Sequence, residues 1–465
     1  IDTYLELSPG SLKVVKANDD YAEVVYSSTS GNLKVDQGYI MRKGVSGLYS
    51  YVVLRGSANE VTVREMRLGY RVDPDLFDYG YVTDQMQGYL PTVAVMQEVD
   101  DQAIMDATYP LPDGTIYTKY NWAHYIDQDS VHGMMSNGDG VWAINPSNEY
   151  MNGGPMKQEL TVHATNKTPI ILQMLQGEHF GSSAQTFGDG DEKIYGPFFI
   201  YVNSGSSHEA MVEDAQAQAG KEKDAWPYSW FSHSLYPQER TTVNGRICLP
   251  WDLSSDKVTV ALSQPGSDFY TQGTGYMYWD KSGADRKFSI KGVRPGTYTL
   301  SAFAGQGEVT DVYTQDITVS GSSMDLGYIR WSVVKLENLL WQIGESDRKS
   351  DGYNMSDKAR AYGLYDLPPA NLTYTVGTST PGEDWYYAQT KTGKWTVAFN
   401  CDESYSGDAI LTTAIAGATS SPTVEVYVNN VKKDTWSFGN DAAIYRSAVL
   451  GGKYDLKTIT FPASE

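Results

Sequence analysis

The sequence predicts an all-β protein built from about three units, and three observations favour this fold class. The chain has 465 residues, and at roughly 150 residues per domain this length suggests about three domains. Hydrophobic residues make up 41% of the chain and charged residues 20%, so the chain can bury hydrophobic cores and is not disordered. Its 35 Tyr and 44 Gly, with many Thr, Ser and Val, favour strands and turns over helices.

Residues 1–241 form the first expected unit, a succession of short strands bounded by Gly, Asn, Asp or Ser. The expected strands include Tyr21–Tyr26, Tyr51–Leu54, Thr62–Val72, Trp142–Ile144 and Ile170–Leu175. A single helix is expected at His208–Lys223, because this segment is rich in Ala, Glu and Gln and is followed by Trp226-Pro227.

Residues 242–332 form the second expected unit, a small β-sandwich of about 90 residues. Val243–Leu249 and Val258–Leu262 are expected strands, and Arg294-Pro295-Gly296 is an expected turn between two alternating strands. Residues 333–465 form the third expected unit. Its expected elements are Leu340–Lys349, Trp395–Phe399, Ala409–Ala416 and Thr423–Val428, followed by a hairpin turn at Asn429-Asn430.

The charge of the chain limits its partners. The formal net charge is −21, which argues against nucleic acid and anionic membranes, because binding to phosphate requires a basic surface. An anionic polysaccharide would meet the same repulsion unless a local basic cleft overcame it. The Debye length at physiological salt is about 8 Å, so a local cluster of cations can do so.

The cysteines and the termini give further expectations. Only Cys248 and Cys401 are present, so neither a disulfide framework nor a thiolate metal site is predicted. No stretch approaches the roughly 20 apolar residues of a membrane span. The chain begins at Ile1 rather than Met, so we interpret it as processed or trimmed and expect a secreted protein whose signal peptide is not in this chain.

Two arginines are expected to share one face of a strand. In the segment EMRLGYRV (65–72), Arg67, Gly69 and Arg71 alternate with Met66, Leu68 and Tyr70. The two guanidinium groups would stand about 13 Å apart along the strand. They could bind carboxylates, since Arg forms a bidentate fork. The alternative is that they belong to the solvated outer face of a sandwich.

A lysine and a histidine are the candidate proton-transfer groups. In IYTKYNWAHY (116–125), strand alternation places Tyr117, Lys119 and Asn121 on one face. A lysine among aromatic rings and near arginines could act as a base, or it could lie exposed along those rings. His179 follows an apolar strand in GEHFG (177–181), where Glu178 could orient or charge the imidazole. The alternative is a structural histidine bonded to backbone, and no metal signature is present.

Several segments spread along most of the chain have a distinctive sequence. They include YIMRKGVSGLYSYVV (39–53), EMRLGYRV (65–72), INPSNEYMNGGPMKQEL (144–160), GEHFG (177–181), YGPFFIYVN (195–203), WPYSW (226–230), RPGTYTLSAF (294–303), LWQIGESDRK (340–349) and KWTVAF (394–399). Together they resemble polysaccharide lyase family 4, the rhamnogalacturonan endolyases. The resemblance rests on their order across all three units. It implies a large catalytic β-sandwich of the galactose-mutarotase type, a fibronectin-III-like sandwich and a jelly roll like those of carbohydrate-binding modules.

The resemblance also implies a chemistry. Lys119 corresponds to the family's base and His179 to its acid, and Arg67 and Arg71 correspond to its paired arginines. The implied reaction is β-elimination in the rhamnose–galacturonate backbone of rhamnogalacturonan I, the substrate. We assign Glu178, Tyr117 and Asn121, with the two arginines, to substrate binding. No cofactor and no catalytic metal are expected, a structural calcium is left open, and we expect a monomer.

Three other functions are alternatives to this one. A non-catalytic pectin-binding or other carbohydrate-binding protein on the same scaffold would keep the aromatic residues, but it would not need Lys119, His179 and both arginines together. A glycoside hydrolase would use two carboxylates, whereas these strands carry Arg, Lys and His. A mutarotase-like enzyme acting on a small sugar would not need two further units.

Overall fold

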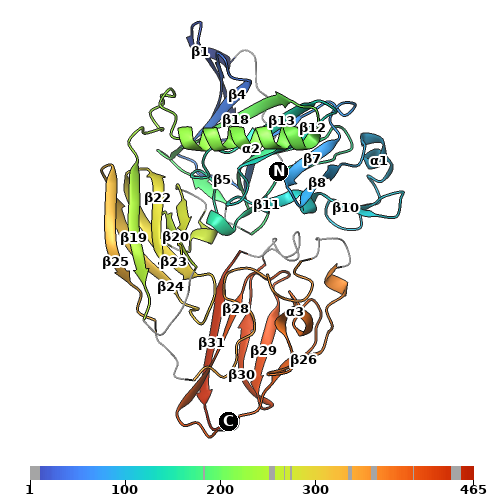
Figure 1. Ribbon diagram of the computed structural model, residues 1–465, viewed down its shortest axis with the longest axis vertical. Coiled ribbons are helices and arrows are strands. Elements are labelled where there is room, and N and C mark those ends of the chain that lie inside the picture. The colour runs from blue at the N-terminus through green and yellow to red at the C-terminus, as the bar shows by residue number, and fades with distance from the viewer. Residues whose placement is uncertain are drawn as a thin grey trace.

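The computed structural model describes residues 11–181, 184–250, 257–266, 268–272, 275–333, 338–357, 364–401, 403–440 and 452–465. Strands dominate these residues, and they fall into three groups that follow one another along the chain (Figure 1). The all-β class with three β-rich units is therefore confirmed. The boundaries of the predicted units remain predictions.

The first group is built on a nine-stranded sheet. Its order is β1 (Leu12–Ala17), β2 (Tyr21–Ser30), β3 (Leu33–Arg42), β4 (Gly47–Arg55), β18 (Glu192–Ser204), β13 (Asp139–Ile144), β12 (Val131–Met135), β7 (Tyr79–Thr83) and β8 (Met86–Tyr89). All neighbouring pairs are antiparallel. The long strand β18, late in the sequence of this unit, lies between β4 and β13. The two parts of the sheet are therefore joined only after most of the unit has been synthesised.

Helix α2 (His208–Ala225) lies across one face of this sheet (Figure 1). Ser207 caps the helix by accepting a hydrogen bond from the backbone of Ala210 at 3.2 Å. Met211, Ala215 and Ala219 recur every four residues on the buried side, which is the spacing of one helix face. They pack with sheet residues in one hydrophobic core. The helix predicted at His208–Lys223 is confirmed.

The other face of the sheet is covered by short strands and turns that carry the candidate site. These elements are β5 (Val61–Val63), β6 (Glu65–Arg71), α1 (Val93–Glu98), β9 (Thr108–Pro110), β10 (Ile116–Thr118), the 3₁₀ helix η2 (Lys119–Trp122), β11 (Ala123–Tyr125), η3 (Gly154–Met156), β14 (Gln158–Leu160), β15 (Val162–His163), β16 (Ile170–Gly177) and β17 (Gln185–Phe187). In the described part of the chain, β16 lies between β15 and β6 in a three-stranded sheet. Side chains from β16 pack onto the large sheet in a second core.

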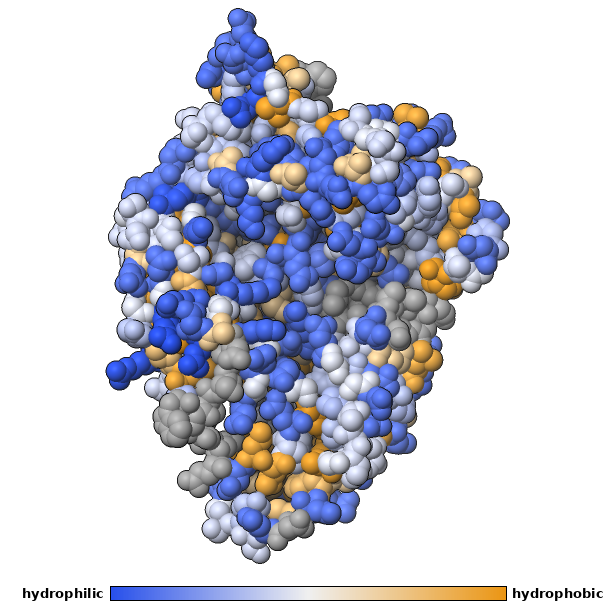
Figure 2. Space-filling model, in the orientation of Figure 1, coloured by the Kyte–Doolittle hydropathy of each residue, from blue (hydrophilic) through white to orange (hydrophobic). Residues whose placement is uncertain are grey.

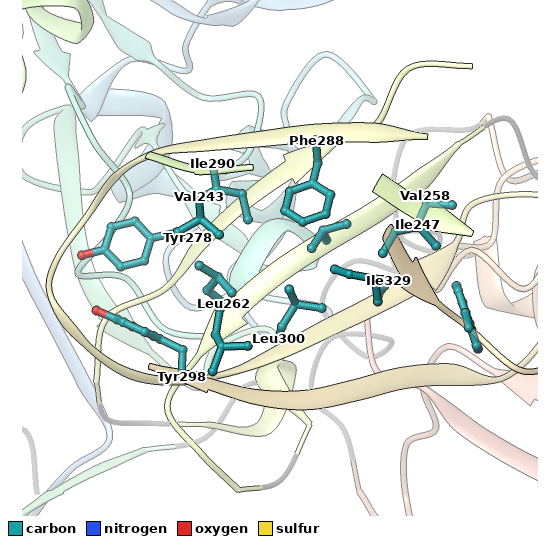
Figure 3. Packing of buried hydrophobic residues seen from close by; sticks show 14 of the residues in the cluster. Val243, Ile247, Val258, Leu262, Tyr278, Phe288, Ile290, Tyr298, Leu300 and Ile329 are labelled. Atoms are coloured by element: carbon teal, nitrogen blue, oxygen red, sulfur yellow. The ribbon is translucent and has the colours of Figure 1, made fainter. Parts of the chain in front are cut away.

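The second group is a sandwich of two sheets around one core (Figure 3). One sheet has the order β22 (Lys287–Val293), β19 (Thr241–Cys248) and β25 (Ser323–Arg330); the other has β21 (Tyr278–Lys281), β20 (Val258–Ser263), β23 (Gly296–Ala304) and β24 (Val312–Val319), with η4 (Phe269–Thr271) beside it. The predicted turn at Arg294-Pro295-Gly296 is present. It joins strands of different sheets rather than the two strands of a hairpin.

The third group consists of two-stranded sheets. Its elements are η5 (Leu364–Asp366), β26 (Leu372–Thr375), α3 (Pro381–Asp384), β27 (Trp395–Ala398), β28 (Asp408–Ile415), β29 (Thr423–Val428), β30 (Val431–Ser437) and β31 (Asp455–Pro462). Asn429 and Asn430 have φ of 47° and 66°, the left-handed pair of a tight hairpin turn, so the predicted turn between β29 and β30 is confirmed. Leu340–Lys349 forms no strand. Figure 2 shows a largely hydrophilic face, with hydrophobic side chains gathered in its lower part.

Arg348 joins the third group to the second. Its side chain is fully buried and donates to both carboxylate oxygens of Asp268, at 3.1 and 2.5 Å. The guanidinium lies 4.5 Å from the ring centroid of Phe269 and 5.0 Å from that of Tyr454. Arg348 belongs to the segment LWQIGESDRK, which forms no strand. Its buried ion pair with Asp268 explains why this segment carries a charged residue.

Candidate functional site

The two arginines lie on one face of β6, as predicted from the alternation. Arg67 and Arg71 are exposed, whereas Leu68 and Tyr70 between them are half-buried. Strand β6 pairs antiparallel with β16, which holds both guanidinium groups at one edge of the small sheet. Arg71 donates to the hydroxyl of Thr168 at 3.1 Å.

The strand predicted over Thr62–Val72 is wrong in one respect, because it is two strands. Strand β5 pairs with β17, and β6 pairs with β16. Arg64 lies between them, and its carbonyl accepts a hydrogen bond from the backbone of Glu178 at 3.1 Å. The chain therefore changes sheets at Arg64, beside the turn that carries His179.

His179 follows β16 and is bonded to a carboxylate that sequence reasoning missed. Nδ1 of His179 lies 2.9 Å from Oε1 of Glu65. The same oxygen accepts a hydrogen bond from Arg67 at 2.6 Å. Burial alone would raise the pKa of Glu65, but His179, Arg67 and Lys119 outweigh it and lower the pKa to about 2. Glu65 is therefore an anion among three basic residues.

Glu178, the carboxylate expected to orient the imidazole, is bonded elsewhere. Arg64 donates to its Oε1 at 3.1 Å, and the Arg64 side chain is 79% exposed. Pairing of β6 with β16 places Glu65 opposite Gly177, which brings Glu65 rather than Glu178 to Nδ1 of His179. No local sequence signal marks this contact, because it depends on the register between β6, which begins at Glu65, and β16, which ends at Gly177.

Lys119 begins a 3₁₀ helix rather than continuing a strand. Strand β10 ends at Thr118, whose hydroxyl accepts a long hydrogen bond of 3.4 Å from the backbone of Tyr120. The alternation expected for Tyr117, Lys119 and Asn121 therefore does not extend past Thr118. The ammonium of Lys119 lies 4.9 Å from the ring centroid of Tyr120, and its charge acts on Glu65.

Two other residues assigned to the site have different surroundings. Tyr117 is buried, and its hydroxyl accepts a hydrogen bond from the backbone of Ala164 at 2.8 Å. Oδ1 of Asn121 is buried, and in the described residues it has no hydrogen-bond partner. Of the two, Asn121 has the polar atom left to bind a ligand.

A second histidine, His163 on β15, lies within the field of the cations. Burial, followed by the charges of Lys119, Arg67 and Arg71, lowers its pKa to about 4, against a hydrogen bond with the carbonyl of Ala164 that raises it. Nδ1 lies 2.8 Å from that carbonyl oxygen, so Nδ1 carries the proton of the neutral ring. His163 is thus neutral near pH 7, and Lys119, Arg67 and Arg71 all act on it electrostatically.

The segment behind His179 is buried rather than being a cleft wall. In the loop Asn148–Leu160, the ammonium of Lys157 donates to the carbonyl of Gly177 and lies 3.4 Å from Glu159. Burial raises the pKa of Glu159 to about 7 in spite of that lysine. Tyr270 of η4 donates to the carbonyl of Phe180 at 2.5 Å. The turn holding His179 is therefore braced by the core on one side and the second unit on the other.

The described residues include neither a metal-binding cluster nor a helix that could span a membrane. Within the residues that the structure describes, no three His, Cys, Asp or Glu side chains gather closely enough to hold a metal ion. The structural calcium left open above is not tested by this. Among the described helices, none has the length and apolar character needed to cross a membrane.

Comparison with known families gives matches in all three parts of the chain. Residues 6–112 match the rhamnogalacturonate lyase family, residues 254–326 match domain II of polysaccharide lyase family 4, and residues 339–465 match its domain III. The last two matches are described as fibronectin-III-like and carbohydrate-binding-module-like. They agree with the fold classes that the resemblance implied for these units.

Individual relatives match over most of the chain. A rhamnogalacturonate lyase of Dickeya dadantii is 36% identical over 98% of this chain and 79% of its own length. A probable rhamnogalacturonate lyase B of Aspergillus flavus is 24% identical over 90% of this chain and 72% of its own. A probable rhamnogalacturonate lyase C of Aspergillus oryzae is 26% identical over 79% and 58%. From these matches and the three-unit fold, the chain belongs to the rhamnogalacturonate lyases of polysaccharide lyase family 4.

Proposed function

We propose that the protein cleaves the rhamnose–galacturonate backbone of rhamnogalacturonan I by β-elimination. The observation that carries this proposal is the group formed by His179 and Arg67 on one oxygen of Glu65, at 2.9 and 2.6 Å. Lys119 acts electrostatically on the same carboxylate, and Arg71 lies on the same strand face as Arg67. In a chain of net charge −21, these cations supply the local basic site that an anionic polysaccharide needs.

The reaction begins with the acidity of the galacturonate carbon C5. Arg67 and Arg71 bind the neighbouring carboxylate and stabilise the negative charge that develops on it when the proton leaves. Lys119, in its neutral form, takes the proton from C5. The electron pair of that C–H bond becomes the C4–C5 double bond.

The same step breaks the bond between C4 and the glycosidic oxygen. That oxygen leaves with the rhamnose, and protonated His179 donates its proton to it. The products are a free rhamnose hydroxyl and a 4,5-unsaturated galacturonate at the new non-reducing end. The chemistry uses no oxidant or reductant. It acts on a plant cell-wall polymer, so we infer that the protein works outside the cell.

The alternative is a carbohydrate-binding protein on the same scaffold, and a second rival is a hydrolase. Digestion of rhamnogalacturonan I in oxygen-labelled water separates all three. A lyase gives products that carry no label and absorb in the ultraviolet through their unsaturated uronate. A hydrolase gives labelled, saturated products, and a binding protein gives no products. Polygalacturonan serves as the control substrate and is expected to give no signal.

A further inference from the structure

Glu65 connects the acid of the site to one of its arginines through a single oxygen atom. Oε1 of Glu65 lies 2.9 Å from Nδ1 of His179 and 2.6 Å from Nη1 of Arg67. The Glu65 side chain is 26% exposed and that of His179 is 11% exposed. The contact is therefore partly shielded from water, where a charge-assisted hydrogen bond is stronger than on an open surface.

The contact fixes the proton on one ring nitrogen. Glu65 accepts from Arg67 and is ionised, so Nδ1 of His179 must donate to it. Nε2, which faces the hydroxyl of Tyr120, is then the nitrogen that transfers a proton to substrate. The hydroxyl of Tyr120 lies 3.5 Å from Nε2 and donates to Asp106 at 2.5 Å, so Tyr120 directs an oxygen lone pair, not its proton, toward the imidazole.

We propose that Glu65 is the positioning residue for His179: it fixes the Nδ1–H tautomer, orients Nε2 toward the leaving oxygen and stabilises the imidazolium. This inference rests on the proposed function, since it assigns a support to the acid of that reaction. Glu65 lies at the start of β6, whereas Glu178, next to His179 in the sequence, accepts a hydrogen bond from Arg64.

The shared oxygen has a consequence for substrate binding. In the free protein Arg67 is bonded to Glu65, so the substrate carboxylate competes with Glu65 for that guanidinium. Replacement of Glu65 by glutamine removes the competing charge and the anchor of His179 together. Turnover then falls, while the affinity for substrate is kept or increased.

Charged and titratable groups lie around His179 and Glu65 and contribute to any pH profile. They are Arg67 of β6, Lys119 and Tyr120 of η2, Asp106, which accepts from Tyr120, and Glu159 of β14. Loss of the Glu65 charge removes a negative neighbour from both His179 and Lys119. The pKa values of both cations therefore fall, and both limbs of the activity profile move to lower pH.

The test compares Glu65→Gln with Glu192→Gln, a matched change in a glutamate of β18 that accepts a hydrogen bond from Arg55 at 2.9 Å. The readouts are kcat and KM across pH on rhamnogalacturonan I, with the pKa of His179 measured from its imidazole NMR signals. For Glu65→Gln we expect kcat to fall about 100-fold, KM to stay level or fall, and the pKa of His179 to drop. Glu65→Asp is expected to recover part of kcat, and Glu192→Gln to behave as wild type.

Three outcomes overturn the inference. One is an unchanged pKa of His179 in Glu65→Gln, and another is an equal effect of Glu192→Gln. A loss of kcat with a raised KM and a lowered melting temperature would show that Glu65 only holds the fold together, which also overturns it. If the wild type gives no unsaturated product, the proposed function fails, yet the NMR comparison still shows whether Glu65 sets the charge of His179.

Discussion

Glu149 of the first unit is bonded to Arg294 of the second, with Oε1 of Glu149 2.8 Å from Nη2 of Arg294. Its other oxygen lies 2.6 Å from Nη1 of Arg240 and accepts a hydrogen bond from Tyr278 at 2.9 Å. The Glu149 side chain is 1% exposed. A buried carboxylate with two guanidinium partners thus joins the catalytic unit to the sandwich that braces the His179 turn.

We predict that Glu149→Gln strongly destabilises the protein. The substitution leaves two buried guanidinium groups without a counter-charge, and breaking a buried ion pair costs about 3–5 kcal/mol. Urea unfolding followed by tryptophan fluorescence measures this cost. The control is Asp20→Asn, which removes an ion pair with Lys43 whose side chains are 77% and 70% exposed. That variant should unfold nearly as wild type, and equal stability of the two variants would contradict the prediction.

The Glu149 cluster also predicts sensitivity to acid. Burial alone would raise the pKa of Glu149, but Arg294 and Arg240 outweigh it and the net pKa is lowered. The stabilisation is therefore fully present above the unfolded pKa near 4.5 and is lost as the pH falls through the lowered, folded value. Melting temperatures below pH 5 should fall less steeply in Glu149→Gln than in wild type. Parallel curves would contradict this.

His132 predicts the opposite pH dependence of stability, a loss as the pH rises. Its Nδ1 lies 2.9 Å from Asp129, and its Nε2 lies 2.8 Å from the carbonyl of Leu172 on β16. Both nitrogens face acceptors, so the ring is held as a buried imidazolium. Burial alone would lower the pKa of His132, but Asp129 and the Leu172 carbonyl raise it overall.

The contribution of His132 is fully present below the unfolded pKa near 6.5 and is lost as the pH rises through the raised, folded value. We expect wild type to lose stability in that alkaline range. His132→Gln is less stable than wild type at pH 6, and the difference narrows as the pH rises. Thermal melts at a series of pH values check this. A difference that widens with pH would contradict it.

The sequence was sufficient for those parts of the site that depend on strand alternation. Arg67 and Arg71 share a face because side chains in a strand have a period of two, and this holds whatever strand lies beside them. The same rule failed at Lys119, because Thr118 caps a 3₁₀ turn and the period changes there. A short polar side chain before an aromatic run was the local signal for that turn.

The contacts between distant segments could not be predicted in the same way. The bond from Glu65 to His179 depends on the register of β6 against β16, and the low pKa of His163 depends on charges from β6 and η2. The loop Asn148–Leu160 is buried because Gly154 packs against Phe269 of the second unit, a contact that no local pattern contains.

Replacing Arg67 or Arg71 should lower activity far more than replacing the neighbouring Arg64. Arg67→Ala and Arg71→Ala each remove a cation that stabilises charge developing on the substrate, so we expect kcat/KM to fall about 100-fold or more. Arg64→Ala is the matched control, since Arg64 directly precedes β6 and its side chain, which is 79% exposed, donates to Glu178. Steady-state kinetics on rhamnogalacturonan I measures all three. A comparable loss in Arg64→Ala would mean that general positive charge, rather than the strand face, drives binding.

The most direct test of the account is the ultraviolet trace of the unsaturated product during digestion of rhamnogalacturonan I by wild type, Lys119→Ala and His179→Ala. Substrate binding is measured alongside by calorimetry. The account predicts a rise in absorbance for wild type, loss of that rise in both variants, and retained binding in both. Unchanged product formation in either variant would contradict the assignment of base and acid. A flat trace for a wild type that still binds the polymer would contradict elimination itself.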